Sequence, residues 1–422
     1  MATIKSSAVI EKITAREILD SRGWPTIEAT VILSGGQKAK ASVPAGASVG
    51  SHEACELRDG DSKRYQGRGV LRAVKKIEEV IAPRLKGLDV TRQAEIDKVL
   101  IELDDTKNKK NLGANSLLAV SLACARAAAL SANQELFVYL RETFSLAEPS
   151  VPVPLFNIFN GGQHADTNLD FQEFLIIPKK KPASEMIRQG AEIFHELGKV
   201  LRSAGYDTDT GAEGGYAPDI NSSIEAIEFI LAASIQAGYN PGQDTFLGID
   251  VGSSVLYDAE SKKYLFSLDN NYFSGANLLG LYDEWLKRYP LVYLEDGFAE
   301  DAWEDWRALT AELGEKMLIV GDDLFTTNSD RLRLGLKEKA GNAIIIKPNQ
   351  VGTLTETIEC VKLAQKHGYK VIASHRSGET TDDFIVDLAV ACRADYLKAG
   401  SLSRGERLAK YNRLLEIAGL IE

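Results

Sequence analysis

The chain has 422 residues, of which 44% are hydrophobic and 26% charged, as is typical of a folded globular protein and not of a disordered one. The formal net charge of −11 argues against an extended surface for nucleic acid, although a local cluster of basic side chains or a metal ion could still bind a small anion. The length favours two domains, one of which could be a large barrel.

The sequence predicts neither a secretion signal nor a membrane span. The first twenty residues alternate polar and apolar positions, and the most apolar stretch, "LLAVSLACARAAAL", is interrupted by Ser121 and Arg126. The four cysteines are scattered and form no C-x-x-C pair, which favours reduced thiols over a disulfide or a zinc site. We therefore expect a cytoplasmic protein.

Residues 1–140 are expected to form an N-terminal α+β domain. The segments "ITAREILDS", "PTIEATVIL" and "KAKASVP" predict a β-meander. Helical periodicity follows in "GVLRAVKKIEEVIAPRLKG", "RQAEIDKVLIEL" and "GANSLLAVSLACARAAALSANQELFVYL". Strands followed by helices favour an α+β unit, and the proline-rich stretch from Ala147 to Pro154 could serve as the linker.

Residues 141–422 are expected to form a barrel of the α/β class. Short apolar runs alternate with helical segments at a nearly constant interval, except for one longer interval that leaves room for extra structure. This repeat is typical of parallel βα units, which most commonly close into a (β/α)₈ barrel. The runs are "DTFLGID", "LVYLED", "KMLIVGDD", "NAIIIKP", "YKVIASHR" and "ADYLKAG".

Each of these runs ends in a charged or polar side chain, and these ends predict a functional site. Barrels of this type carry their active site at the C-terminal ends of the strands, so the side chains should meet on one rim. They are Asp250, Glu295, Asp322, Lys347, His375 and Lys398.

The three acids on this rim predict a Mg²⁺ site. Converging carboxylates repel one another and raise each other's pKa values, and a hard divalent cation removes that cost. Carboxylates without sulfur and with little imidazole favour Mg²⁺ over zinc. The alternative is that each acid is an ordinary strand-end turn or N-cap residue.

The two lysines on the rim need a separate explanation. A cation and a second ammonium group nearby would lower the pKa of Lys347 enough for it to act as a base, while Lys398 would stay charged and hold an anion. Alternatively, either lysine caps a helix or extends past the rim into solvent.

Four loops add candidate residues. "NGGQHADTNLDFQEF" and "TGAEGGYAPD" carry acid–base groups next to glycines, which let the backbone approach a ligand or merely form turns. "SVPAGASVGSHEA" is either a lid with a hydroxyl for a metal or phosphate, or a plain loop, and "SHRSGET" suits a phosphate. The candidates are His164, Gln172, Glu173, Glu213, Ser48, Arg376 and Ser377. Together, the rim and these loops indicate proton abstraction from carbon, stabilisation of an enediolate by a cation, and departure of a β-hydroxyl.

The chain resembles the enolase family, the phosphopyruvate hydratases of glycolysis and gluconeogenesis, over essentially its whole length. The resemblance extends to the lid and to "SHRSGET", beyond what a shared barrel explains. It is carried by "LDSRGWPTIEA", "PAGASVGSHEACELRDGD", "LGANSLLAVSLA", "NIFNGGQHADTNLDFQEF", "LEDGFAEDAWEDW", "GDDLFTTN", "IIIKPNQVGTLTET", "ASHRSGETTDDFIVDLAV" and "KAGSLSRGERLAKYN".

The resemblance implies an enolase-type barrel, the substrates 2-phosphoglycerate and phosphoenolpyruvate, and a homodimer or homo-octamer. Two Mg²⁺ ions are implied, one on Asp250, Glu295 and Asp322 and a second on Ser48 and the substrate phosphate. Lys347 would be the base at C2. Glu213, aided by Glu173, would be the acid for loss of the C3 hydroxyl, and Lys398 would contact the substrate carboxylate. The pocket would be completed by His164, Gln172, His375, Arg376 and Ser377.

Three departures from the family pattern bear on this reading. Ala212 stands where an aspartate is usual, beside the implied acid; Val49 replaces a usual threonine in the lid; and Gly297 replaces a usual proline beside Glu295. The first could lower the pKa of Glu213 or loosen its loop. A non-catalytic binding protein that keeps the enolase fold is therefore the main alternative, and a different enzyme of the same superfamily, such as a sugar-acid dehydratase, is the other.

Overall fold

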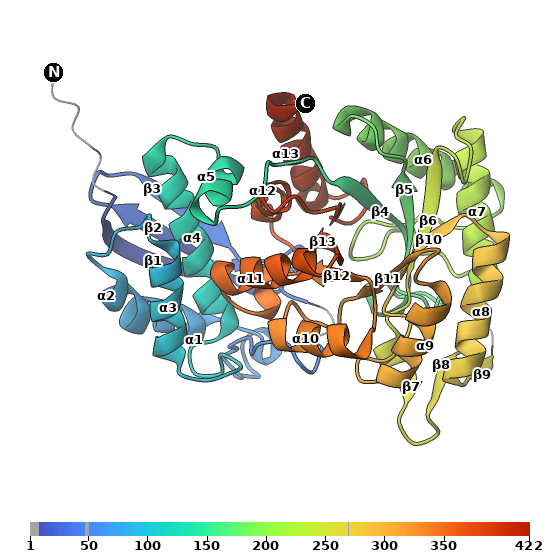
Figure 1. Ribbon diagram of the computed structural model, residues 1–422, viewed down its shortest axis with the longest axis horizontal. Coiled ribbons are helices and arrows are strands. Elements are labelled where there is room, and N and C mark those ends of the chain that lie inside the picture. Colours follow the sequence, from blue (N-terminus) through green and yellow to red (C-terminus); the bar gives the residue numbers. More distant parts are fainter. Residues whose placement is uncertain (1–7, 47–49, 269) are drawn as a thin grey trace.

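The structure, a computed structural model, describes residues 8–46, 50–268 and 270–422, and shows an N-terminal α+β unit beside a closed barrel (Figure 1). Strands β1 (Ile10–Leu19), β2 (Pro25–Leu33) and β3 (Lys38–Ser42) form the antiparallel meander that the sequence predicts. The helices that follow are α1 (Leu71–Lys76), a π-helical turn (Ile77–Ile81), α2 (Ala82–Leu85), α3 (Gln93–Asp104), α4 (Ala114–Ala132) and α5 (Leu136–Thr143).

Helix α4 is the core of the N-terminal unit. Its alanine-rich sequence lets it pack closely on β2 and β3, and most of its residues are buried. It is long and apolar enough to cross a membrane, but 83% of its apolar window is buried inside the protein. This is the pattern of a core helix.

The barrel closes in the order β10-β11-β12-β13-β14-β4-β5-β6. Its strands are β4 (Val153–Asn160), β5 (Glu173–Pro178), β6 (Thr245–Asp250), β10 (Leu291–Glu295), β11 (Leu318–Gly321), β12 (Ala343–Ile346), β13 (Lys370–Ser374) and β14 (Tyr396–Lys398). The six strands predicted as parallel βα units are parallel to their neighbours in that set. Strand β5 runs antiparallel to both β4 and β6, because its connection from β4 contains no crossover helix.

The proposed linker from Ala147 to Pro154 was wrong at its end, because Val153 and Pro154 already pair with β14. Proline is tolerated there, near the start of the strand. The division into domains 1–140 and 141–422 stays a prediction.

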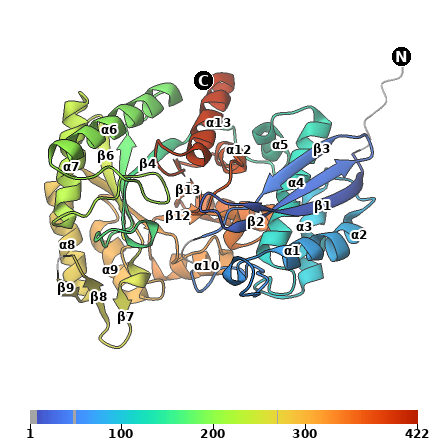
Figure 2. The same cartoon turned by 180° about the vertical axis from the view of Figure 1, so that it is seen from behind.

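The barrel helices form an outer layer, and the N-terminal unit and the small β7–β9 sheet lie at opposite ends of the molecule (Figures 1 and 2). The sheet, made of β7 (Tyr257–Asp258), β8 (Lys263–Phe266) and β9 (Asn271–Phe273), is the extra structure predicted for the long interval after Asp250. The helices are α6 (Ala183–Ser203), α7 (Ser223–Gln236), α8 (Gly275–Arg288), α9 (Trp303–Leu313), α10 (Ser329–Glu338), α11 (Leu354–Lys366), α12 (Phe384–Ala391) and α13 (Gly405–Ile421).

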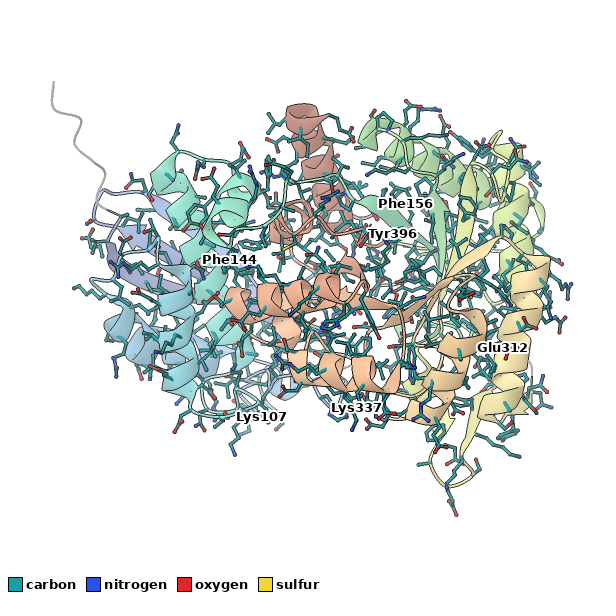
Figure 3. All side chains as sticks on the ribbon, in the orientation of Figure 1. Lys107, Phe144, Phe156, Glu312, Lys337 and Tyr396 are labelled. Atoms are coloured by element: carbon teal, nitrogen blue, oxygen red, sulfur yellow. The ribbon has the colours of Figure 1, made fainter. Side chains whose placement is uncertain are left out.

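The interior of the barrel is a packed apolar core. Of the residues labelled in Figure 3, Tyr396 on β14 packs against this core, whereas Phe156 on β4 packs on Tyr411 of α13. Such a core leaves the rim as the place for polar chemistry. Its buried members are Leu155, Leu175, Ile177, Tyr293, Val320, Ala343, Ile345 and Ile372.

Candidate active site

The predicted rim residues lie at one end of the barrel. Asp250, Glu295 and Lys398 are the last residues of β6, β10 and β14, and Asp322, Lys347 and His375 directly follow β11, β12 and β13. Because β5 is antiparallel, its first residue lies at this same rim, and Glu173 pairs with Asp250 across the sheet.

A single pocket gathers nearly all of the predicted site residues. Glu295 lies buried against Lys398 and does not line it, and Ser48 lies outside the described residues. The side chains that line the pocket are Glu53, His164, Gln172, Glu173, Glu213, Asp250, Asp322, Asp323, Lys347, Ser374, His375, Arg376, Ser377 and Lys398.

One side of the pocket, which we call the Lys398 half, is built around a lysine among carboxylates. The Nζ of Lys398 lies 3.0 Å from Asp250 Oδ2, 2.8 Å from Glu295 Oε2 and 3.1 Å from Glu173 Oε2. Burial opposes its charge, but the carboxylates outweigh burial and hold the pKa of Lys398 well above its usual value. Burial, and next the charge of Asp250, raise the pKa of Glu295 to about 8.

Two histidines and a third glutamate, Glu213, complete the Lys398 half. His164 Nδ1 lies 3.3 Å from Glu173 and 3.7 Å from Glu213, and His375 Nε2 lies 3.3 Å from Glu213. Burial would lower the pKa of His164, but the two glutamates raise it to about 9. Burial and the charge of Glu213 raise the pKa of Glu173 to about 7. Against the effect of burial, the charge of His164 and the hydrogen bond from His375 hold the pKa of Glu213 well below its usual value. The two carboxyls therefore differ, and Glu173 is the one that keeps a proton near neutral pH.

The opposite side, the Lys347 half, contains a simpler ion pair. Lys347 Nζ contacts Asp322 Oδ2, and the other oxygen of Asp322 accepts from Gln350 Nε2 at 3.0 Å. Burial disfavours the charge of Lys347, but Asp322 raises its pKa above the usual value. The sequence predicts a lowered pKa for Lys347. The protein on its own raises it instead, because Asp322 is the charge that Lys347 contacts.

The remaining predicted residues, Arg376, Ser377 and Gln172, also line the pocket. Arg376 donates to Glu53 at 2.8 and 3.2 Å, and Ser377 Oγ lies 3.3 Å from His164 Nε2. Gln172 packs against Gly252: a Cβ added to Gly252 would lie 2.4 Å from the Cδ of Gln172. Gly252 has a φ of +60°, so glycine is favoured there on both counts.

The predicted cation ligands offer hard oxygen donors of the kind that Mg²⁺ prefers. Glu295 is fully buried, and its Oε1 has no hydrogen-bond partner in the part of the chain that the structure describes, as expected of a group that binds something else. Asp250 and Glu295 converge on Lys398, whereas Asp322 contacts Lys347. The donor set therefore fits a hard cation, although among the described residues Asp322 groups with Asp296 and Asp323, and the three predicted ligands do not form a group of their own within 4.8 Å.

Sequence reasoning missed several residues of the site. Asp296 accepts the N–H groups of Asp322 and Asp323, each at 2.9 Å, and so fixes the turn after β11. Glu53 reaches the pocket from the N-terminal unit, and no pattern within its own segment indicates this. Arg407 had a signal: it falls in phase with Tyr411 and Leu414 on the buried stripe of α13, where a charged residue is unexpected.

The departures from the family pattern leave the site's backbone in place. The N–H of Ala212 donates to His164 O at 2.8 Å, and its carbonyl accepts from Arg407 at 3.2 Å, so both contacts are independent of the side chain. The carbonyl of Gly297 accepts from Tyr282 at 2.9 Å. Val49 lies outside the described residues.

Comparison with known proteins gives a consistent assignment over both parts of the chain. Residues 10–140 match the family model "Enolase, N-terminal domain", and residues 148–421 match "Enolase, C-terminal TIM barrel domain". A curated protein named Enolase from Bdellovibrio bacteriovorus is 49% identical over 409 residues, which cover 97% of this chain and 95% of that protein. The chain belongs to the enolase family.

Proposed function

We propose that this enzyme, a hydro-lyase of the enolase family, catalyses the Mg²⁺-dependent, reversible dehydration of 2-phosphoglycerate to phosphoenolpyruvate. The observation that carries the proposal is the division of one pocket into two chemically different halves. A lysine faces it from the Lys347 half, and a pair of glutamates with separated pKa values faces it from the Lys398 half. Such a pair of opposed groups suits removal of a proton and of a hydroxyl from neighbouring carbons.

Substrate binding is assigned to the cationic and hydroxyl groups. Arg376 and Ser377 are proposed to hold the phosphate, because a guanidinium donates two parallel hydrogen bonds to such an anion. Glu53 pairs with Arg376 now, so the phosphate would have to replace or share that contact. Lys398 is proposed to hold the substrate carboxylate, and His164, Gln172 and His375 to complete the pocket.

The proton transfers are assigned to three residues. Lys347 accepts the proton from C2, so the C–H electron pair enters the carboxylate as an enediolate. The electron pair of the enediolate then forms the C2–C3 double bond as the C3 hydroxyl leaves as water, taking its proton from the Glu173–Glu213 pair. With a pKa of about 7, Glu173 is the better proton donor of the two, and Glu213 orients it through His164.

The cofactor assignment follows from the oxygen-rich rim. We propose one Mg²⁺ on Asp250, Glu295 and Asp322 and a second that joins Ser48 and the substrate phosphate. When bound, these ions would supply positive charge that stabilises the enediolate. The charge of Asp322, engaged by such an ion, would no longer hold the proton on Lys347.

Three further expectations remain proposals. A cytoplasmic location is supported by Cys124, Cys360 and Cys392, which are buried as free thiols. The assembly is proposed to be a homodimer or a homo-octamer. No nucleic-acid partner is expected, because the net charge is strongly negative.

The test is a direct assay on purified protein. With 2-phosphoglycerate and Mg²⁺, the ultraviolet absorbance of the enol ester should appear, and a chelator should abolish it until Mg²⁺ is restored. A folded, Mg²⁺-saturated protein that gives no signal would refute the proposal and favour a binding protein with this fold. A sugar acid assayed in parallel should give no dehydration; turnover of that acid alone would indicate a different dehydratase.

A further inference from the structure

Arg407 lies at the junction of two loops of the site without lining the pocket itself. It is fully buried on α13. Its Nη1 donates to His375 Nδ1 at 2.5 Å and to the carbonyl of Arg376 at 2.7 Å, and its Nη2 donates to the carbonyls of Ser377 at 2.6 Å and Ala212 at 3.2 Å. One guanidinium therefore joins the loop after β13 to the loop that carries Glu213.

This contact determines where the proton sits on His375. A guanidinium has no acceptor and keeps its charge in proteins, so Nδ1 of His375 must accept and cannot carry a hydrogen. The remaining proton is on Nε2, which faces Glu213 Oε2 at 3.3 Å and donates to it. Burial lowers the pKa of His375, and the charges of Arg407 and Lys398 lower it further, whereas Glu213 raises it. The result is a pKa of about 3, which agrees with a neutral ring.

The backbone at Gly400 is shaped around the same junction. A Cβ there would lie 2.8 Å from Arg407 Cδ, 3.0 Å from the carbonyl of Glu213 and 3.1 Å from His375 Cε1. Gly400 has a φ of +84°, and its neighbour Ser401 donates from its N–H to the carbonyl of Glu213 at 2.9 Å. The three groups are thus packed against one point of the chain, and a side chain at position 400 would displace at least one of them.

We propose that Arg407 is a positioning residue of the reaction: it fixes His375 as the Nε2–H tautomer and, through that ring and the carbonyl of Ala212, fixes the Glu213 carboxylate at the pocket. The inference rests on the proposed function, since Glu213 matters only if it takes part in the loss of the hydroxyl. Arg407 touches no residue on the Lys347 half in the contacts above, so its effect should be confined to the Lys398 half.

The first measurement uses the unaltered protein. Nitrogen-15 NMR of the protein labelled at histidine should show His375 as a neutral ring with the proton on Nε2. His375→Gln identifies its signals. A wild-type His375 with its proton on Nδ1, or a charged ring at neutral pH, overturns the proposal whatever the variants do.

The second measurement compares two substitutions with a matched control. Arg407→Gln should lower kcat about 100-fold, because displacing Glu213, which orients the proton donor, by a fraction of its length costs about that much, while KM changes far less. His375 should then titrate at a higher pH, adding an acid limb to the kcat profile. Arg407→Lys keeps the charge but cannot bridge both loops, so its kcat should lie between those of wild type and Arg407→Gln. Arg413→Gln, on the same helix but paired with Asp387 and Glu135, should lose stability and keep kcat.

The outcomes separate the two proposals. A folded Arg407→Gln protein with wild-type kcat and an unchanged His375 titration refutes the positioning role. An equal loss in Arg413→Gln would also refute it, because helix docking alone would then explain the effect. If Arg407→Gln does not fold, the positioning role is tested by the kcat of Arg407→Lys and by the tautomer of His375 in the NMR of the wild-type protein. A wild-type protein that turns over no 2-phosphoglycerate instead refutes the proposed function, and the tautomer still tests the local geometry.

Discussion

The two lysines of the rim have the same side chain and both lie at strand ends, yet their surroundings differ. Lys398 is 2% exposed and has three carboxylates within 3.1 Å, whereas Lys347 is 13% exposed and pairs, among the described residues, with Asp322 alone. Removing one charge would leave Lys398 still strongly paired, but would leave Lys347 without its principal counter-ion. The number of carboxylates around each ammonium group therefore separates a fixed cation from a potential base.

Loss of Lys347 should have the largest effect on turnover. Lys347→Ala should lower kcat by about 10²- to 10⁴-fold, since a positioned general base contributes that much. Phosphoenolpyruvate should still bind, which calorimetry with Mg²⁺ can measure. Lys347→Arg is the matched variant, because it keeps the pair with Asp322 but does not release its proton. It should be as inactive as Lys347→Ala and nearly as stable as wild type. An active Lys347→Arg enzyme would show that the ion pair matters and the base does not.

Loss of Lys398 should instead have the larger effect on folding. Lys398→Met leaves three buried carboxylates without their shared cation, and removing one partner from a buried pair costs about 3–5 kcal/mol. Urea unfolding of the metal-free protein measures this. Lys370→Met, which breaks the half-exposed pair with Asp395, should cost under about 1 kcal/mol. Equal losses in Lys398→Met and Lys347→Met would remove the distinction between the two halves.

His164 gives the Lys398 half a pH dependence of stability between about pH 6.5 and 9, whereas the shifted pKa values of Lys347 and Asp322 lie outside that range. The pKa of His164 is raised from 6.5 to about 9, so its stabilising contribution is fully present below pH 6.5 and is lost as the pH rises to about 9. Over that window the contribution is of the order of 3 kcal/mol. His164→Gln should therefore flatten the fall in the free energy of unfolding of the metal-free protein between these pH values.

His367→Gln is the control for this measurement, because His367 is exposed at the end of α11. It should leave the pH profile unchanged. A His164→Gln protein whose stability falls as steeply as that of wild type would mean that the ring is neutral in the folded state.

The sequence predicts the rim better than it predicts the contacts across it. The polar end of each apolar run is enough to place Asp250, Lys347 and Lys398 together, because parallel strands share one carboxyl edge. The partners of these residues depend on packing between distant segments: neither Glu53, from the N-terminal unit, nor the pairing of Asp322 with Lys347 follows from local periodicity. The antiparallel β5 was missed for a related reason, since its direction depends on a connection without a helix.

The smallest effect is expected from restoring the family's aspartate beside Glu213. Ala212→Asp adds a carboxylate to the Lys398 half, but the backbone groups of residue 212 already hold His164 and Arg407 in place. The change in kcat should therefore be less than about threefold, as for substitutions that break no buried contact. Steady-state kinetics of the two proteins side by side measures it, with Lys347→Ala as the inactive reference. A large gain from near-zero activity would show that the aspartate side chain, and not the loop backbone, orients Glu213, and that the natural chain works mainly as a binding protein.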